Sequence, residues 1–336
     1  MQWGASAEAG LADMERRRIG LSEGVPATIR AAFAPVGSVA EAEAYTRGLT
    51  HSHYENFSVV SILLPRRLRQ DFCNVYAFCR IADDLGDEVG EKGRALAYLA
   101  AFRAQLAACY AGLSRTDGGG GGETAVFAAL GQTIRRHDIP MTPFDDLIRA
   151  FEQDQRVTRY ETFEQAVDYC RRSADPVGRI VLYMCGYRDE ARQRLSDKIC
   201  TALQLINFWQ DVRRDMLERD RLYLPRADMI RFGVTEEQLR RGEVTAGYRA
   251  LIRFEVERVE GMFAEGAALL PMLKPAYRKQ IALFVKGGRA VCRAVRRQGF
   301  DTLSRRPRLS KMQKGRLIAG TLAGYVMGKM TVEGRA

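Results

Sequence analysis

The chain has 336 residues, 46% hydrophobic and 28% charged, which allows a sizeable core and excludes general disorder. Seven scattered cysteines without a CxxC pair, and only three histidines, argue against a disulfide framework and a zinc site. The net charge is +11, and residues 286–316 hold eleven Lys or Arg against one acid, Asp301. This stretch could meet anionic lipid headgroups or an anionic ligand, or be a solvated surface. No nucleic-acid-binding module is recognisable.

Hydrophobic spacing predicts helices along most of the chain and almost no strands. Ser38, with Glu41 three residues later, is expected to cap the first clear helix. Further helices are predicted over 66–87, 95–113, 124–137, 143–153, 161–185, 188–215, 247–270, 275–298 and 308–330. A glycine-rich loop covers 116–123, and 221–239 is expected to be a connection followed by one short helix. We expect no signal peptide, and no apolar run approaches the ~20 residues that span a bilayer.

Acidic side chains interrupt an apolar helix in NVYAFCRIADDLGDE, residues 74–88. At helical spacing, one face carries Tyr76, Arg80, Asp83 and Asp87. Arg80 could also be a buried counter-ion of Asp83 or Asp87, and the whole face could be solvated and rich in ion pairs.

A second polar face lies in TALQLINFWQDVRRDMLERD, residues 201–220, and carries Gln204, Asn207, Asp211 and Asp215. Carboxylates four residues apart on a helix stand about 6 Å from each other, which suits shared metal ions. Buried carboxylates are costly unless they are paired or bound to metal. Magnesium prefers one or two carboxylates plus substrate phosphates. Two such faces across a cavity would therefore fit a magnesium–diphosphate site.

Two other segments attract attention. YCRRSADPVGRIVLYMCG, residues 169–186, places Pro176 and small residues such as Gly178 inside a predicted helix, either as a packing kink or as a cavity wall. RDRLYLP, residues 219–225, places Arg221 and Tyr223 just after the second acidic helix. They could close over a diphosphate or belong to a surface connection.

Together these segments resemble the squalene/phytoene synthase family, which joins prenyl diphosphates head to head. The resemblance runs from about His53 to Lys314. YAFCRIADDLGDE and QLINFWQDVRRD are similar to the two acidic motifs of the family, and YCRRSADPVG, RLYLP and GFDTLSRRPRLSK match further signatures. The resemblance implies an all-α, single-domain isoprenoid synthase-type bundle around a central hydrophobic cavity. Residues 49–330 would be the catalytic domain and residues 1–48 a partly helical extension.

The resemblance also implies roles for individual residues. Catalytic roles would fall to Asp83, Asp87, Asp211, Asp215 and Tyr169. Roughly two or three Mg²⁺ ions would be held by the four aspartates and Asn207. Substrate binding would fall to Asn56, Phe57, Tyr76, Arg80, Gln204, Asn207, Arg221 and Tyr223.

Within the family, HYENFSVVSILLP, NFWQDV and GGRAVCRAVRRQGFDTLSRRPRLSK are similar to the bacterial hydroxysqualene synthase branch of hopanoid biosynthesis. That branch ionises presqualene diphosphate and captures the cation with water, so no NADPH is expected. Gln210 stands where the carotenoid enzymes typically have Arg, and Glu55-Asn56 replaces a Lys-Ser type sequence.

Two alternatives remain open at this point. One is another family reaction that yields presqualene diphosphate, squalene or phytoene. The other is a non-catalytic binding or assembly protein on the same fold. We expect a prenyl diphosphate as partner, no nucleic acid, and a cytoplasmic location. A peripheral position on the inner face of the plasma membrane is a further option, and no oligomeric state is indicated.

Overall fold

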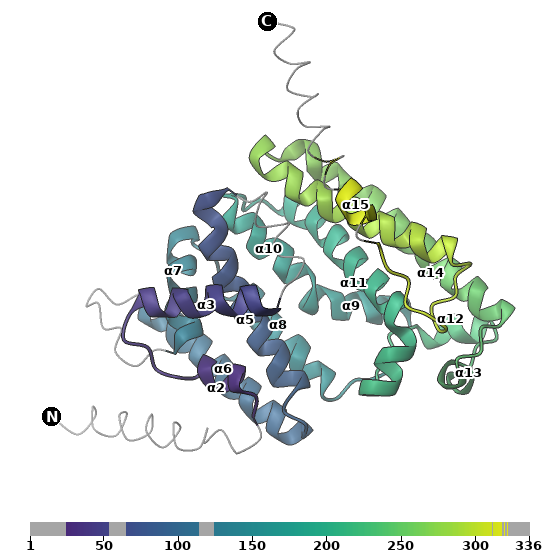
Figure 1. The fold of residues 1–336 in the computed structure, drawn as a ribbon, viewed down its shortest axis with the longest axis horizontal. Coiled ribbons are helices and arrows are strands. Elements are labelled where there is room, and N and C mark those ends of the chain that lie inside the picture. The colour runs from purple at the N-terminus through teal and green to yellow at the C-terminus, as the bar shows by residue number, and fades with distance from the viewer. Residues whose placement is uncertain are drawn as a thin grey trace, which may run out of the picture. The chain divides into compact units, whose positions relative to one another are not determined.

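The computed structural model describes residues 25–53, 65–113, 124–310, 312–317, 319 and 321. These residues form helices joined by short connections (Figure 1). Within these ranges the only β-type pairings are two isolated bridges, Pro35 with Thr124 and Arg159 with Leu222. The all-α fold expected from the sequence is therefore confirmed. The described residues divide into two compact units.

The first unit contains the described residues up to 53, together with 70–136 and 151–155. Its helices are α2 (Ala27–Ala32), α3 (Val39–His53), most of α5 (Arg69–Asp87), α6 (Lys92–Leu113) and α7 (Ala125–His137). Its core is aromatic: Phe102 of α6 lies 5.1 Å from Phe78 of α5 and 4.7 Å from Phe127 of α7, between ring centroids. The α3 cap is formed as expected, since the Glu41 amide donates to the Ser38 hydroxyl at 3.2 Å.

Buried polar contacts fix the rotation of α5 about its axis. Asp71, fully buried, accepts hydrogen bonds from the Thr133 hydroxyl at 3.0 Å and from Arg136 at 2.6 Å. The amide of Asn74 donates to the Ala129 carbonyl at 3.0 Å. Buried polar groups of this kind specify one arrangement, because any other rotation would leave them without partners. They thereby set the direction of the acidic face further along α5.

The second unit contains 65–69, 137–150 and the described residues from 156 onward. Its elements are η1 (Arg66–Leu68), most of α8 (Thr142–Asp154), α9 (Phe163–Ser173), α10 (Asp175–Met184), α11 (Glu190–Arg219), α12 (Arg226–Arg231), α13 (Glu236–Arg241), α14 (Ala246–Gly266), η2 (Ala267–Met272) and α15 (Pro275–Arg297). The long helix α11 is central, and it packs against α9, α10, α14, η2 and α15. Trp209 of α11, Tyr248 and Phe263 are completely buried in this core.

The structure corrects the predicted single helix over 161–185. The chain breaks at Ala174, and Pro176 lies in the first turn of α10, where its missing N–H costs nothing. Gly178 is required for packing, because a Cβ there would come within 2.5 Å of both Cys200 Sγ and Ser196 Oγ on α11. The segment is thus a close helix crossing. Residues 221–239 also differ from the expectation, since they contain two short helices, α12 and the start of α13.

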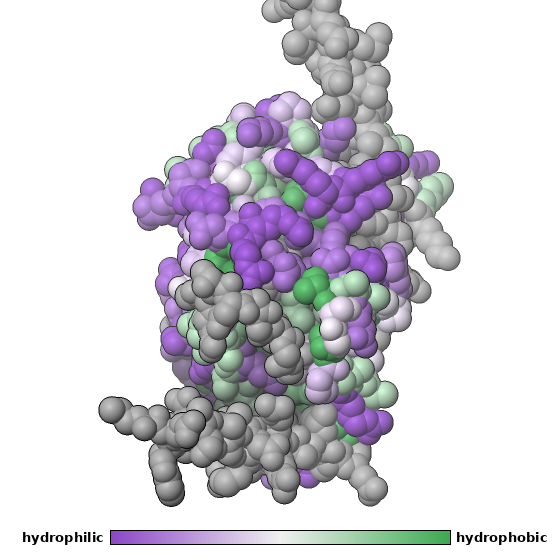
Figure 2. All heavy atoms as spheres, turned by 90° about the vertical axis from the view of Figure 1, so that its left-hand side faces the viewer, coloured by the Kyte–Doolittle hydropathy of each residue, from purple (hydrophilic) through white to green (hydrophobic). Residues whose placement is uncertain are grey.

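Helix α6 has the length and hydropathy of a membrane-crossing helix, which the sequence reading had not found. Its Leu99, Phe102 and Leu106 are buried within the first unit, and core helices of other proteins pass the same test. The face shown in Figure 2 is mainly hydrophilic, with hydrophobic residues in small separate areas. All seven cysteines are free thiols, as their spacing predicted.

Candidate active site

The first acidic motif lies on α5. Asp83 and Asp87 are half-buried, as is Tyr76 on the same helix. Arg80 forms an ion pair with Asp84, which is almost completely buried, and lies 3.7 Å from Asp83. The counter-ion of Arg80 is therefore chiefly Asp84, an acid that the sequence reading did not single out. This pairing neutralises the buried member of the motif and leaves Asp83 and Asp87 partly accessible.

The second acidic motif lies on α11, where burial is deeper. The side chains of Asp211 and Asp215 are 7% and 11% exposed. Gln204 is half-buried, and Asn207 is exposed. The helical phase predicted from the sequence is therefore correct for the two aspartates, which lie at the inner side of their helix.

Asp211 is held by an arginine from far along the chain. Arg306 Nε lies 2.5 Å from Asp211 Oδ1 and Arg306 Nη2 lies 2.8 Å from Oδ2, a two-pronged contact. Arg214 also approaches, at 3.3 Å from Asp211 and 3.4 Å from Asp215. Sequence reasoning noticed the basic stretch that contains Arg306, but 95 residues separate it from its partner. No local pattern assigns such a pair.

Asp215 is the less compensated carboxylate of this pair. Burial, and then the negative charge of Asp211, raise its pKa to about 6 despite the nearby Arg214. Within the described residues, no group of three or more His, Cys, Asp or Glu could hold a metal ion. The pair Asp211 and Asp215 offers one or two carboxylates, which is the share that Mg²⁺ takes from protein when substrate phosphates supply its other oxygens. These two residues therefore fit Mg²⁺ only together with a phosphate-bearing ligand.

Four aromatic rings cluster beside this helix. Phe208 of α11 and Tyr223 are stacked, with ring centroids 3.6 Å apart and planes within 2°. Tyr169 of α9 lies 5.6 Å from Tyr223, and Tyr160 lies 5.6 Å from Tyr223 and 5.7 Å from Tyr169. Tyr169 and Tyr223, which were assigned separately to the site, therefore lie next to each other, and Phe208 and Tyr160 are aromatic neighbours that were not assigned to it. Aromatic faces stabilise positive charge, particularly away from water.

The connection after α11 is positioned by backbone hydrogen bonds. The helix ends where Asp220 takes a left-handed conformation, with φ of 50°, and the Arg221 amide donates to the Asp215 carbonyl at 3.0 Å. The Leu222 amide then donates to the Thr158 carbonyl at 2.8 Å, in a parallel bridge. Arg221 and Tyr223 are buried. This segment is therefore part of the packed interior around the aromatic cluster, and the reading as a surface connection is wrong for these two residues.

Two parts of the predicted site stay predictions. Asn56 and Phe57 lie outside the described residues, as does Glu55. Asp83 and Asp87 belong to the first unit and Asp211 and Asp215 to the second, so the convergence of the four carboxylates on one site stays a prediction.

Comparison with known proteins identifies the family. Residues 50–313 match the model of squalene/phytoene synthase. A phytoene synthase of Thermus thermophilus is 35% identical over 80% of this chain and 88% of its own length. A hydroxysqualene synthase of Sinorhizobium fredii is 32% identical over 66% of this chain and 72% of its own length.

Among solved structures, squalene synthase HpnC from Alicyclobacillus acidocaldarius is 44% identical, with a TM-score of 0.72, over 82% of this chain and 99% of its own. The matched region contains both acidic motifs and the aromatic cluster. The chain therefore belongs to the squalene/phytoene synthase family and is an enzyme that processes prenyl diphosphates.

Proposed function

We propose that the enzyme ionises presqualene diphosphate and captures the resulting cation with water, giving hydroxysqualene and diphosphate. In this reaction the carbon–oxygen bond to diphosphate breaks, the diphosphate keeps the electron pair, and the oxygen of water forms the new bond and loses a proton. Two curated relatives support this choice, because they are named hydroxysqualene synthase, at 32% and 36% identity.

One observation carries the proposal over the carotenoid-type reaction. By the family resemblance, Gln210 stands where the carotenoid enzymes typically have an arginine. Gln210 is buried, and its side-chain amide donates to the Pro307 carbonyl at 2.5 Å. Gln210 thus anchors the segment from which Arg306 reaches Asp211. An arginine at position 210 would bring a charge into this buried place, where the amide makes a neutral contact instead.

The chain's own residues would share the chemistry as follows. Asp83, Asp87, Asp211 and Asp215, with Asn207, would hold Mg²⁺, which when bound supplies positive charge for the departing diphosphate. Tyr76, Arg80, Gln204 and Arg221 would orient the substrate, as would Asn56 and Phe57. The faces of Tyr169, Phe208 and Tyr223 would lie along the cation and exclude bulk water from it. Water capture requires no hydride, so no NADPH enters the scheme.

The principal alternative is a head-to-head condensation of farnesyl or geranylgeranyl diphosphate to presqualene diphosphate, squalene or phytoene. The 35% identity to a phytoene synthase favours it. Purified enzyme with Mg²⁺, both with and without NADPH, should be incubated separately with farnesyl, geranylgeranyl and presqualene diphosphates in H₂¹⁸O. We expect ¹⁸O-labelled hydroxysqualene from presqualene diphosphate alone. Phytoene from geranylgeranyl diphosphate, or an unlabelled hydrocarbon from presqualene diphosphate, would contradict the proposal.

The variant that tests the acidic motif is Asp211→Asn, which keeps the size of the side chain and removes its charge. We expect this variant to lose turnover with presqualene diphosphate. A non-catalytic binding protein would behave differently: neither the natural protein nor the variant would give product, yet a prenyl diphosphate analogue would still stabilise the natural protein against heat.

A cytoplasmic enzyme at the inner face of the plasma membrane would suit a lipid-soluble product, and fractionation of cells tests that location.

A further inference from the structure

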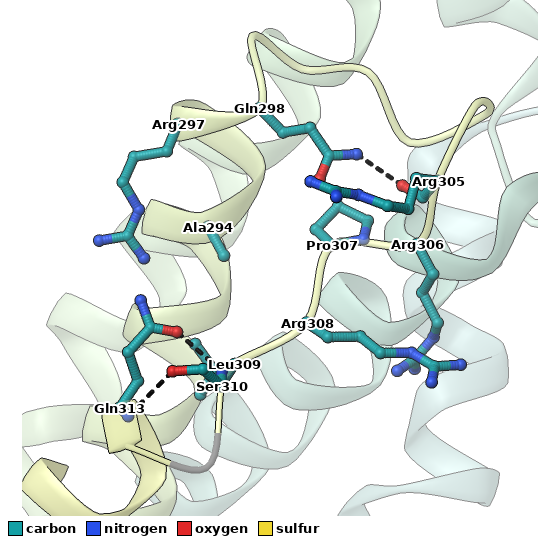
Figure 3. A pocket seen from close by; sticks show the side chains of 10 residues that line it. All are labelled: Ala294, Arg297, Gln298, Arg305, Arg306, Pro307, Arg308, Leu309, Ser310 and Gln313. Atoms are coloured by element: carbon teal, nitrogen blue, oxygen red, sulfur yellow. Dashed lines mark hydrogen bonds between the residues drawn. The ribbon is translucent and has the colours of Figure 1, made fainter.

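A cavity rich in arginine lies outside the acidic motifs, between the end of α15 and the segment that follows it. The chain reverses at Gly299 and Phe300, which have φ values of 63° and 60° and therefore left-handed conformations. Residues 305–310 then line a cavity of about 610 Å³ together with the last turn of α15 (Figure 3). Four of the ten lining residues are arginines and none is acidic.

Within the part of the chain that the structure describes, one of these four guanidinium groups has a carboxylate partner. Arg306 is bound to Asp211 and is thereby committed to the acidic motif. For Arg297, Arg305 and Arg308 the described part of the chain contains no ion pair, although other arginines of α11 to α15, such as Arg214, Arg258 and Arg296, have one. Three of the lining arginines thus have no carboxylate partner among the described residues. Such a concavity concentrates anions, since its low-dielectric walls focus the field.

The walls of the cavity are already held in place. The Gln298 side-chain amide donates to the carbonyls of Asp301 and Arg305, both at 2.5 Å. On the other side, Gln210 binds the Pro307 carbonyl. In Figure 3, Arg305 extends toward Gln298, whereas Arg306 and Arg308 extend to the other side of the segment. A fixed backbone with arginines along both sides loses little entropy when an anion binds.

From this arrangement we infer that the cavity lined by Arg297, Arg305 and Arg308 is a binding site for a phosphate-bearing anion that does not use the carboxylates of the acidic motifs. Guanidinium groups match phosphate oxygens in geometry and in charge, which favours phosphate over a simple halide. The anion can come from two sources: free diphosphate, or the headgroup of an anionic lipid. Both present the same chemistry to the arginines.

The test uses the full chain and a triple variant, Arg297→Gln with Arg305→Gln and Arg308→Gln. Its matched control removes the same charge elsewhere, by Arg188→Gln with Arg194→Gln and Arg241→Gln, three partly exposed arginines that have carboxylate neighbours. Inorganic diphosphate is titrated calorimetrically in EDTA, because without a metal ion the aspartates repel this anion. Sedimentation with phosphatidylglycerol-containing vesicles, and with pure phosphatidylcholine vesicles, forms the second arm.

We expect the cavity variant to lose at least tenfold in affinity in one or both arms, while the control keeps its affinity within about twofold. Loss for diphosphate identifies a free anion as the ligand, and loss for phosphatidylglycerol vesicles identifies a lipid headgroup. The inference is overturned if the natural protein binds neither probe, or if the two variants lose affinity equally. Circular dichroism checks folding. If the triple variant does not fold, the single variants should each show a partial loss.

Discussion

The contact between Arg306 and Asp211 leads to a prediction about stability and metal binding together. In Arg306→Gln, the nearly buried Asp211 carboxylate keeps only the longer contact to Arg214, at 3.3 Å. Breaking a fully buried ion pair costs about 3–5 kcal/mol. The Arg306 side chain remains 33% exposed, so solvent screens part of its charge. We therefore expect a loss of about 1–3 kcal/mol in the free energy of unfolding, measured in EDTA.

Magnesium should reduce the difference in stability between Arg306→Gln and the natural protein. Arg306 occupies both oxygens of Asp211, so a cation must displace it from at least one of them. In Arg306→Gln no displacement is needed, and Mg²⁺ should stabilise the variant more than it stabilises the natural protein. The assay is urea unfolding with EDTA or with Mg²⁺, followed by circular dichroism.

Arg306→Lys serves as the control for this prediction. A lysine keeps the charge but cannot make a two-pronged contact, so the stability of Arg306→Lys should fall between those of Arg306→Gln and the natural protein. Equal stability of Arg306→Gln and the natural protein in EDTA would refute the assigned role of the pair. Equal stabilisation by Mg²⁺ would refute the competition for Asp211.

Further predictions concern packing, titration and the aromatic cluster. Gly288→Ala places a Cβ 2.1 Å from the ring of the buried Phe263 and should lower the free energy of unfolding by about 1–3 kcal/mol. The Cβ of Gly287→Ala meets nothing within 4 Å, so this control should be neutral or stabilising by up to about 1 kcal/mol. Urea unfolding measures both. Burial raises the pKa of Asp175 to about 8, so the folded state holds a proton that the unfolded state releases. Its contribution to stability is complete below about pH 4 and is lost as the pH rises through 8, at up to about 1.4 kcal/mol per pH unit; Asp175→Asn should flatten this slope in unfolding curves recorded from pH 5 to 9. Tyr223→Leu removes a ring from the aromatic cluster and should lower kcat roughly 5- to 30-fold, whereas Tyr223→Phe should stay within about threefold in the product assay.

The helices were predictable because their apolar residues recur at helical spacing over long stretches. The break at Ala174 was not, since apolar positions continue through it and Pro176 is equally compatible with a kink or a first turn. The second short helix after α11 was missed because six-residue helices carry little periodic signal.

The aspartates of the candidate site followed from the phase of their helices, but several of their partners did not. Asp84 was within reach of local reasoning, because Arg80 and Asp84 are four residues apart and such pairs meet on a helix. Arg306 was not, since only the folded chain brings it to Asp211. Tyr160 joins the aromatic cluster from a connection that has no periodic pattern at all.

Asp215 has two roles, one for its side chain and one for its main chain. Its carboxylate belongs to the acidic motif, while its main-chain carbonyl accepts the amide of Arg221 and so defines where α11 stops. An Asp215→Asn exchange alters only the role of the carboxylate, because every residue type supplies the same main-chain carbonyl. The exchange therefore gives experimenters an enzyme in which the electrostatics of the motif change while Tyr223 keeps its place.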